Sequence, residues 1–208
     1  MKKVLVVNNE KNKDDLGWIR YIKSAIYSIE EVEFIIIHHS EVHANAIEKI
    51  KPDYIYLTGR ANQDWTYEEA LNDYATTIKM LQNTDIPTLG VCAGLQLIAL
   101  AHNSSFGKMI EVGEDEEDIR ETGFSKIEIK KDSYLFKGLE NPFYCYQAHR
   151  EEVKSVPERF NLLASSEMCK IQAIGHQDKK IYGVQFHPER YNENYLGGKK
   201  ILKNFLNL

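Results

Sequence analysis

One of the three cysteines, Cys92, stands between Gly90 and Gly94, directly after a short apolar run and directly before an apolar helical pattern. A nucleophile on a strand-to-helix turn needs small neighbours, because the turn is tight and its residue adopts an unusual backbone conformation. The helix start directs free N–H groups and the positive end of its dipole at the thiol, which favours the thiolate and can hold an oxyanion. Cys92 is therefore a candidate nucleophile, although a free cysteine is more often a small buried apolar side chain.

A histidine and a carboxylate lie close together near the end of the sequence, at His187 and Glu189. A thiolate nucleophile needs a general base that later acts as an acid, and a group that orients this base. His187 follows an apolar run at 181–186. If this run is a strand parallel to the one before Cys92, both side chains lie at the same edge of the sheet. A His-Pro-Glu triplet alone carries little information, but together with the cysteine turn it predicts a Cys-His-Glu group.

The first half of the sequence alternates short apolar runs with amphipathic stretches, which is typical of β-α-β units in a parallel sheet. We expect strands at 4–7, 33–37, 54–57 and 88–91, and helices at 19–29, 44–50, 66–81 and 95–101. Asp14 and Asp15 are candidate caps of the first helix, and Thr66 with Glu69 forms a capping box for the third. In such sheets ligands bind at the carboxyl ends of the strands, where Cys92 lies.

The second half has shorter strand-like runs separated by polar turns, which indicates an antiparallel extension. These runs lie at 127–129, 143–146, 162–164, 171–174 and 181–186. An acidic segment at 114–121 is interpreted as a solvated loop. Because no repeat or linker interrupts the sequence, we expect one domain over 1–208. The predicted fold is α/β and flavodoxin-like, with a mostly parallel central sheet flanked by helices and additional antiparallel strands in the second half.

The composition excludes several classes of protein. The 208 residues are 43% hydrophobic, which is enough for a continuous core. With 26 basic and 31 acidic residues the net charge is −5, so we expect no nucleic-acid partner. The sequence has no apolar run of the roughly 20 residues that cross a membrane and no secretory signal pattern, so we expect no membrane partner and a cytoplasmic location.

The remaining cysteines and a group of histidines suggest no further chemistry. Cys145 falls within a strand pattern and Cys169 in a polar turn, and neither has neighbouring glycines of the kind around Cys92. Three cysteines are too few for a disulfide framework. His38, His39 and His43 are close in sequence but lack the acidic residues that usually support metal ligands, so we expect surface histidines and no metal.

The two motifs Gly-Val-Cys-Ala-Gly-Leu-Gln at 90–96 and Gly-Val-Gln-Phe-His-Pro-Glu at 183–189 together resemble those of class I glutamine amidotransferases. The resemblance covers nearly the whole chain, because the strand at 54–57, the segment 146–149 and the closing helix fall in the same order. It implies a Cys-His-Glu triad that releases ammonia from glutamine through a γ-glutamyl thioester. Neither a metal nor an organic cofactor is needed for this chemistry.

The resemblance also implies a role for individual residues. Cys92 would be the nucleophile, His187 the general base and acid, and Glu189 its orienting partner. The main-chain N–H of Ala93 would supply half of the oxyanion hole. Gln96 would hold the amino acid part of the substrate, and His149 would line the glutamine site.

One segment departs from the family. After the third strand the family usually has a Gly-Gly-Pro or Asn-Gly-Pro turn whose glycine N–H completes the oxyanion hole, whereas this chain continues Thr58-Gly59-Arg60-Ala61. Aligned without a gap, Arg60 takes the donor position; shifted by one residue, Gly59 does. A positive φ is costly for arginine. We therefore expect a loop at 58–63 that is reshaped for another substrate or ordered by a partner, with Arg60 as a possible cation for a substrate carboxylate.

Three functions follow from the resemblance. The first is a glutaminase that passes ammonia to a separate synthase subunit, because 208 residues leave no room for a domain that activates the acceptor. The second is a stand-alone γ-glutamyl hydrolase of a small γ-glutamyl compound, which the unusual loop permits. The third is a non-catalytic regulatory relative, and the intact Cys-His-Glu set argues against it.

Overall fold

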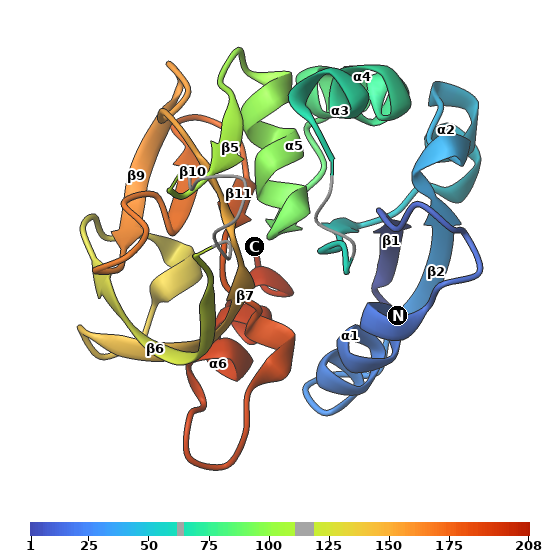
Figure 1. Ribbon diagram of the computed structural model, residues 1–208. Helices are drawn as coiled ribbons and strands as arrows, with labels where there is room; N and C mark the ends of the chain where they lie inside the picture. The colour runs from blue at the N-terminus through green and yellow to red at the C-terminus, as the bar shows by residue number, and fades with distance from the viewer. Residues whose placement is uncertain (62–64, 111–118) are drawn as a thin grey trace.

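The computed structural model describes residues 1–61, 65–110 and 119–208 (Figure 1). Within these residues the strands form a nine-stranded sheet in the order β2-β1-β3-β4-β11-β10-β9-β6-β7. One half of the sheet is parallel and consists of β1 (Lys3–Asn8), β2 (Glu33–His38), β3 (Tyr54–Leu57), β4 (Thr88–Val91) and β11 (Ile181–Val184). The start of this order, 2-1-3-4, is that of a flavodoxin-like sheet.

The second half of the sheet is antiparallel, as the short strand patterns predict. It consists of β10 (Ala173–His176), β9 (Phe160–Ser165), β6 (Glu121–Ile129) and β7 (Phe143–His149). Two further strands, β5 (Phe106–Lys108) and β8 (Glu151–Val153), form a small separate sheet that the sequence analysis did not predict. The predicted fold class is therefore confirmed.

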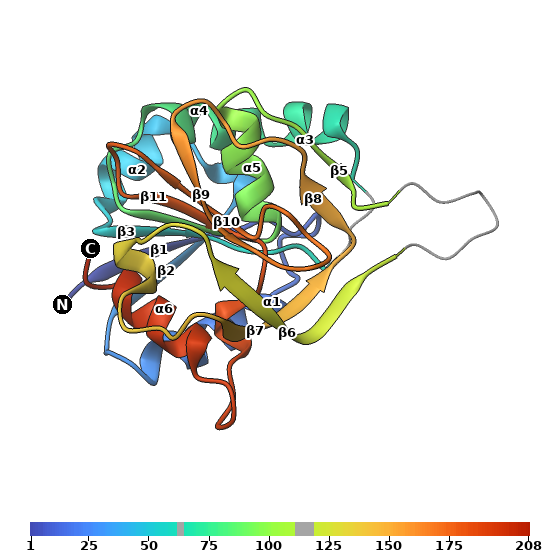
Figure 2. The ribbon, with the colours of Figure 1, turned by 90° about the vertical axis from the view of Figure 1, so that its left-hand side faces the viewer.

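Helices cover both faces of the sheet, as Figure 2 shows from the side. The helices α1 (Gly17–Tyr27) and α6 (Gly197–Phe205) pack on one face. The other face carries α2 (Ala44–Ile50), α3 (Tyr67–Asp73), α4 (Ala75–Asn83) and α5 (Ala93–Ala101). Three short 3-10 helices complete the described elements: η1 (His39–Glu41), η2 (Tyr134–Phe136) and η3 (Pro188–Arg190). Within the described parts of the chain no helix is long and apolar enough to span a bilayer.

Two helix predictions need correction. The single helix expected at 66–81 is interrupted at Tyr74, between α3 and α4. The Tyr74 hydroxyl donates a 2.6 Å hydrogen bond to the main-chain oxygen of Asn9, and this buried anchor accompanies the break. The capping box of Thr66 and Glu69 is confirmed at the start of α3. Asp15 is not the N-cap residue of α1, because that position is taken by Leu16. The Asp15 carboxylate instead accepts a hydrogen bond from the N–H of Gly17.

Candidate active site

Cys92 is the N-cap residue of α5 and has φ 52° and ψ −106°. This left-handed conformation is uncommon for a residue with a side chain and marks a strained turn. The flanking glycines make the turn possible. A Cβ on Gly90 would lie 2.4 Å from the carbonyl oxygen of Gly94, and a Cβ on Gly94 would lie 2.7 Å from that of Leu57. The predicted strand-to-helix turn is therefore present, and Cys92 lies at the carboxyl end of β4.

The first turn of α5 provides hydrogen-bond donors beside the thiol. The N–H of Cys92 is already bonded to the carbonyl of Val184, at 2.8 Å. Ala93 is the first residue of the helix, so no carbonyl of its own helix can accept its N–H. Its amide and the positive end of the helix dipole are thus available to an anion that forms next to the sulfur.

His187 lies at the same sheet edge because β11 is parallel to β4, with Val184 opposite Val91. Its main-chain N–H donates to the carbonyl of Tyr146 at 2.7 Å, which ties the segment after β11 to β7. Nδ1 of the imidazole lies 2.7 Å from Oε1 of Glu189, and both side chains are buried. The parallel strand and the His187–Glu189 contact are as the sequence predicts.

The electrostatic environment of His187 favours its protonated form. Burial alone lowers the pKa of His187, but the Glu189 carboxylate and the neighbouring Cys92 thiol outweigh burial and raise the pKa to about 10. At neutral pH the imidazole is therefore a cation between a carboxylate and a sulfur. This arrangement places an imidazole, oriented by a carboxylate, beside the candidate nucleophile.

Tyr56 supports Glu189 from β3, and nothing in the sequence distinguishes it from a core tyrosine. Its hydroxyl donates to Oε2 of Glu189 at 3.1 Å. Complete burial and the Glu189 carboxylate both raise the pKa of Tyr56, so the hydroxyl keeps its proton and can only donate. Glu189 thus has one oxygen on His187 and the other on Tyr56, which fixes the carboxylate plane.

Trp18 is a second contact that sequence analysis did not find. Its indole stacks on the imidazole of His187, with 4.3 Å between ring centroids and 14° between ring planes. In the sequence Trp18 is one more apolar residue of an amphipathic helix. Only the packing of α1 against the segment after β11 reveals the contact.

Gly59 lies against both catalytic candidates. A Cβ on Gly59 would lie 2.9 Å from Cε1 of His187 and 3.5 Å from Cβ of Cys92. The main chain at Gly59 therefore lies close to the side chains of both residues. Whether Gly59 or Arg60 supplies the second oxyanion donor stays a prediction.

Arg60 does not have the strained conformation expected of it. Among the described residues other than glycine, positive φ occurs at Lys51, Cys92 and Asn103 and not at Arg60. The Arg60 side chain is 7% exposed, and its guanidinium carbon lies 5.2 Å from the ring centroid of Trp65. The backbone strain that a positive φ would cause at Arg60 is therefore absent.

Two side chains from the end of β1 hold this turn in place. The main-chain N–H and the side-chain amide of Asn9 donate to Thr58, to its hydroxyl at 3.0 Å and to its carbonyl at 2.7 Å. The Glu10 carboxylate accepts from the N–H of Ala61 at 2.8 Å. Hydrogen bonds from residues that follow β1 thus hold the turn at 58–61. The last part of the predicted loop, Asn62 and Gln63, lies outside the described residues.

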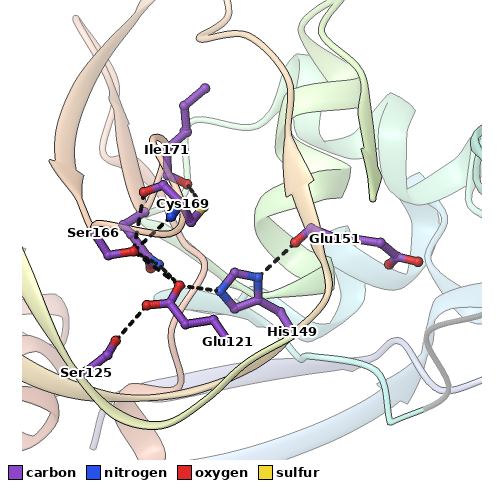
Figure 3. A network of polar contacts seen from close by, with 8 residues as sticks. Glu121, Ser125, His149, Glu151, Ser166, Cys169 and Ile171 are labelled. Atoms are coloured by element: carbon purple, nitrogen blue, oxygen red, sulfur yellow. Dashed lines mark hydrogen bonds and ion pairs between the residues drawn. The ribbon is translucent and has the colours of Figure 1, made fainter. Parts of the chain in front are cut away.

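His149 is held by a buried polar network rather than left free in a pocket. Figure 3 shows its ring between the carbonyl of Glu151, 3.0 Å from Nδ1, and the carboxylate of Glu121, 3.1 Å from Nε2. Both ring nitrogens therefore already have hydrogen-bond partners within the network. Only its carbon surface remains for a substrate, and a direct substrate contact stays a prediction.

Glu121 corrects the interpretation of the acidic segment. We expected 114–121 to be a solvated loop; residues 114–118 lie outside the described residues, but Glu121 is 3% exposed at the start of β6. Burial raises the pKa of Glu121, but hydrogen bonds from His149 and Ser125 outweigh this effect, and the pKa is lowered. Gln172 also donates to the same carboxylate, at 2.8 Å.

The other predicted side chains are placed as follows. Gln96 lies in the first turn of α5, 2% exposed, and its Oε1 has no hydrogen-bond partner among the described residues.

Cys145 and Cys169 are buried, and burial raises the pKa of both thiols, which opposes thiolate formation. His38 and His43 bond to nearby main-chain oxygens. We expected His39 at the surface, and this prediction is wrong. Its ring is buried and stacks on Tyr74, with the ring centroids 4.0 Å apart.

Comparison with known protein families agrees with this geometry. Residues 14–208 match the family model "Glutamine amidotransferase class-I". This chain belongs to that family. Among its relatives is a subunit of the glutamine-hydrolyzing GMP synthase of Methanocaldococcus jannaschii, 43% identical over 128 residues, which are 62% of this chain and 63% of the relative. The match thus spans less than two thirds of the relative's length.

Three more proteins are similar to this chain over a larger share of its length. The glutamine-hydrolyzing GMP synthase of Clostridium tetani is 35% identical over 167 residues, which are 79% of this chain but only 30% of that protein. A crystal structure from Thermoplasma acidophilum, provisionally named as the corresponding GMP synthase subunit, has a TM-score of 0.77 and 27% identity and covers 100% of this chain and 93% of that one. A Thermotoga maritima glutamine amidotransferase shares the fold, with a TM-score of 0.70 over 100% and 97% of the two chains, at 18% identity.

Proposed function

We propose that this protein is a glutaminase that hydrolyses the γ-carboxamide of glutamine through a thioester on Cys92 and supplies the ammonia to a synthase partner. The observation that carries the proposal is the placement of Cys92 at the start of α5, beside an imidazole whose Nδ1 lies 2.7 Å from Glu189. The proposed roles are nucleophile for Cys92, general acid and base for His187, and orienting carboxylate for Glu189.

The first half of the reaction forms the thioester. The Cys92 thiolate attacks the carboxamide carbon, and the carbonyl oxygen becomes an oxyanion. We assign the stabilisation of this charge to the N–H of Ala93, at the start of α5, and to an N–H of the turn at Gly59 and Arg60, which lies close to Cys92 and His187. His187 then donates its proton to the departing nitrogen, and ammonia leaves as the tetrahedral intermediate collapses.

The second half regenerates the enzyme. Neutral His187 takes a proton from water, and the resulting hydroxide attacks the thioester carbon. Collapse of this second intermediate releases glutamate and returns the thiolate next to the imidazolium. Glu189 stabilises the cation at each stage, and Tyr56 keeps that carboxylate in position.

The names of the relatives favour a synthase that makes GMP as the partner. In the Clostridium tetani protein the matching part is 30% of a longer chain, which is consistent with a glutaminase domain that works with a larger synthase portion. We infer that glutamine is the substrate here and that the synthase is a separate polypeptide. The cytoplasmic location and the lack of a nucleic-acid or membrane partner stay predictions.

A stand-alone γ-glutamyl hydrolase is the second candidate. Arg60 favours it, because this buried guanidinium follows the turn beside Cys92; the Glu10 carboxylate attracts it, and its Nε has no hydrogen-bond partner among the described residues. A substrate carboxylate could occupy this position. The non-catalytic alternative is the least favoured, since the chain has Cys92, His187 and Glu189 and the imidazole lies 2.7 Å from the carboxylate.

Ammonia release from glutamine, measured with and without a candidate GMP-forming synthase subunit, tests the proposal. A glutaminase subunit releases ammonia from glutamine in the presence of the synthase, and Cys92→Ala abolishes the release. A γ-glutamyl hydrolase instead cleaves small γ-glutamyl compounds without the synthase and faster than glutamine. Absence of both activities in a folded protein would favour the non-catalytic alternative.

A further inference from the structure

Trp18 is the second residue of α1 and contacts the catalytic histidine from outside the family motifs. The indole and imidazole planes are 14° from parallel, with centroids 4.3 Å apart. Aromatic pairs commonly adopt either offset-stacked or edge-on arrangements, and this pair is stacked. A nearly parallel contact at this distance is well suited to a cationic ring above the face of an indole.

The other sides of the imidazole are already occupied. Glu189 lies at Nδ1, Gly59 packs against Cε1, and the carbonyl of Tyr146 holds the main-chain N–H of His187. Trp18 covers a ring face. His187 is 1% exposed, whereas Trp18 is partly exposed and packs on the core cluster beneath it. The indole therefore separates the imidazole from solvent on this side and limits rotation about its side-chain bonds.

Several titratable and charged groups lie around the stacked rings of His187 and Trp18. Glu189 and Cys92 face His187 itself, and Tyr56 lies behind Glu189. The nearest cation to the indole is Arg190, 5.8 Å from its ring centroid. Arg190 lies closer to two tyrosine rings, Tyr21 at 4.4 Å and Tyr146 at 4.6 Å. The imidazole therefore has the closer stacking contact with the indole.

We propose that Trp18 is a positioning residue that fixes the plane of His187 and stabilises its imidazolium form through the stacked indole. The inference rests on the proposed glutaminase function. Trp18 acts through His187, so its loss weakens proton transfer to the leaving nitrogen more than it weakens substrate binding. The mechanism does not require a tryptophan as such, only an aromatic face at this position.

A matched set of variants distinguishes aromatic stacking on His187 from shielding of its ring from solvent by any apolar side chain. Trp18→Phe keeps an aromatic face, Trp18→Leu keeps an apolar side chain without one, and Tyr21→Leu removes a neighbouring ring on the same helix that does not contact His187. Glutamine hydrolysis is measured with the synthase present. We expect Trp18→Leu to lower kcat about tenfold with KM changed less than twofold, and Trp18→Phe and Tyr21→Leu to remain within about threefold of wild type.

The pH profile of kcat/KM supplies the second readout. Loss of the indole removes a contact that stabilises the cation, so the alkaline limb of the Trp18→Leu profile moves to lower pH, by up to about one unit. Equal losses in Trp18→Phe and Trp18→Leu, or an unmoved alkaline limb, overturn the inference. An inactive wild type would contradict the proposed function instead.

A spectroscopic measurement tests the contact without turnover. In a Trp65→Phe background Trp18 is the remaining tryptophan, since the sequence has two. A protonated imidazole quenches a stacked indole more strongly than a neutral one. We therefore expect the emission of Trp18 to rise at alkaline pH as His187 loses its proton, and the transition to disappear in His187→Ala. An emission that does not depend on His187 would contradict the stacked arrangement.

Discussion

The N–H of Ala61 donates a 2.8 Å hydrogen bond to the carboxylate of Glu10. This contact joins the end of β1 to the turn that passes beside Cys92. Together with Asn9, which bonds to Thr58, it orders a turn that lacks the glycine-proline sequence usual in the family. Residues that follow β1 thus hold the turn beside Cys92 by hydrogen bonds.

The Glu10 anchor leads to a first prediction. Glu10→Ala removes the acceptor for Ala61 and lets the turn move, so we expect kcat for glutamine to fall about tenfold or more, with a smaller effect on KM. Glu10→Gln keeps an amide oxygen at the same position and should retain most of the activity. Steady-state kinetics of both variants check this. Equal activity of Glu10→Ala and wild type would show that the turn needs no such anchor.

Gly59 carries a second prediction. A methyl group there would approach Cε1 of His187 to 2.9 Å, which the buried ring cannot avoid without moving away from Cys92. We expect Gly59→Ala to lower kcat at least a hundredfold while the circular dichroism spectrum stays that of wild type. Gly107→Ala is the matched control, because its added methyl would meet only the end of the Lys154 side chain, at 3.3 Å. Full activity of Gly59→Ala would be incompatible with this packing.

The charge of Glu189 determines a third prediction, about pH. The carboxylate raises the pKa of His187, so Glu189→Gln lowers this pKa and moves the alkaline limb of kcat/KM to lower pH. We expect a measurable residual activity, since an orienting group contributes less than the base it positions. His187→Ala and Cys92→Ala should abolish turnover. A shift of the alkaline limb to higher pH would reverse the assigned effect of Glu189.

Glu121 leads to a fourth prediction, about stability. Its pKa is lowered in the folded state, so its contribution is present above the pKa of the unfolded chain, near 4.5, and is lost as the pH falls through the lower folded value. Glu121→Gln should therefore reduce the free energy of unfolding at pH 7 by about 1–3 kcal/mol, with a smaller difference from wild type near pH 3. Urea titrations at both pH values measure this.

Glu128→Gln is the control for Glu121→Gln. Glu128 lies on the same strand, but it is solvent-exposed and pairs with Lys126 and Lys130 at the surface. We expect no measurable change in stability for this variant. A loss in Glu128→Gln as large as that in Glu121→Gln would mean that the buried network with His149 has no special role.

The sequence was most informative where the chemistry depends on neighbours along the chain. The turn at Cys92 and the His187–Glu189 contact each depend on residues within a few positions, and both could be predicted. The contacts of Tyr56, Glu10 and Trp18 join segments far apart in the sequence, so each of these residues looks ordinary in its own element. Such contacts depend on how strands and helices pack, which local patterns do not specify.

The break between α3 and α4 and the conformation of Arg60 show the same limit. The apolar spacing at 66–81 is helical throughout, and the break at Tyr74 accompanies a hydrogen bond to Asn9, which follows β1. Arg60 would be strained only with a positive φ, which it does not have. Its actual conformation follows from the contacts that Asn9 and Glu10 make with the turn.

The central claim is that Cys92 attacks the carboxamide, and a mass-spectrometric measurement tests it most directly. The protein is treated with a glutamine-like diazoketone, digested, and its cysteine peptides are mapped, with excess glutamine as competitor. We predict rapid labelling of Cys92 that glutamine slows, and none at Cys145 or Cys169, whose burial raises the pKa of both thiols. Faster labelling of either buried cysteine, or labelling of Cys92 that is unchanged in His187→Ala, would contradict the account.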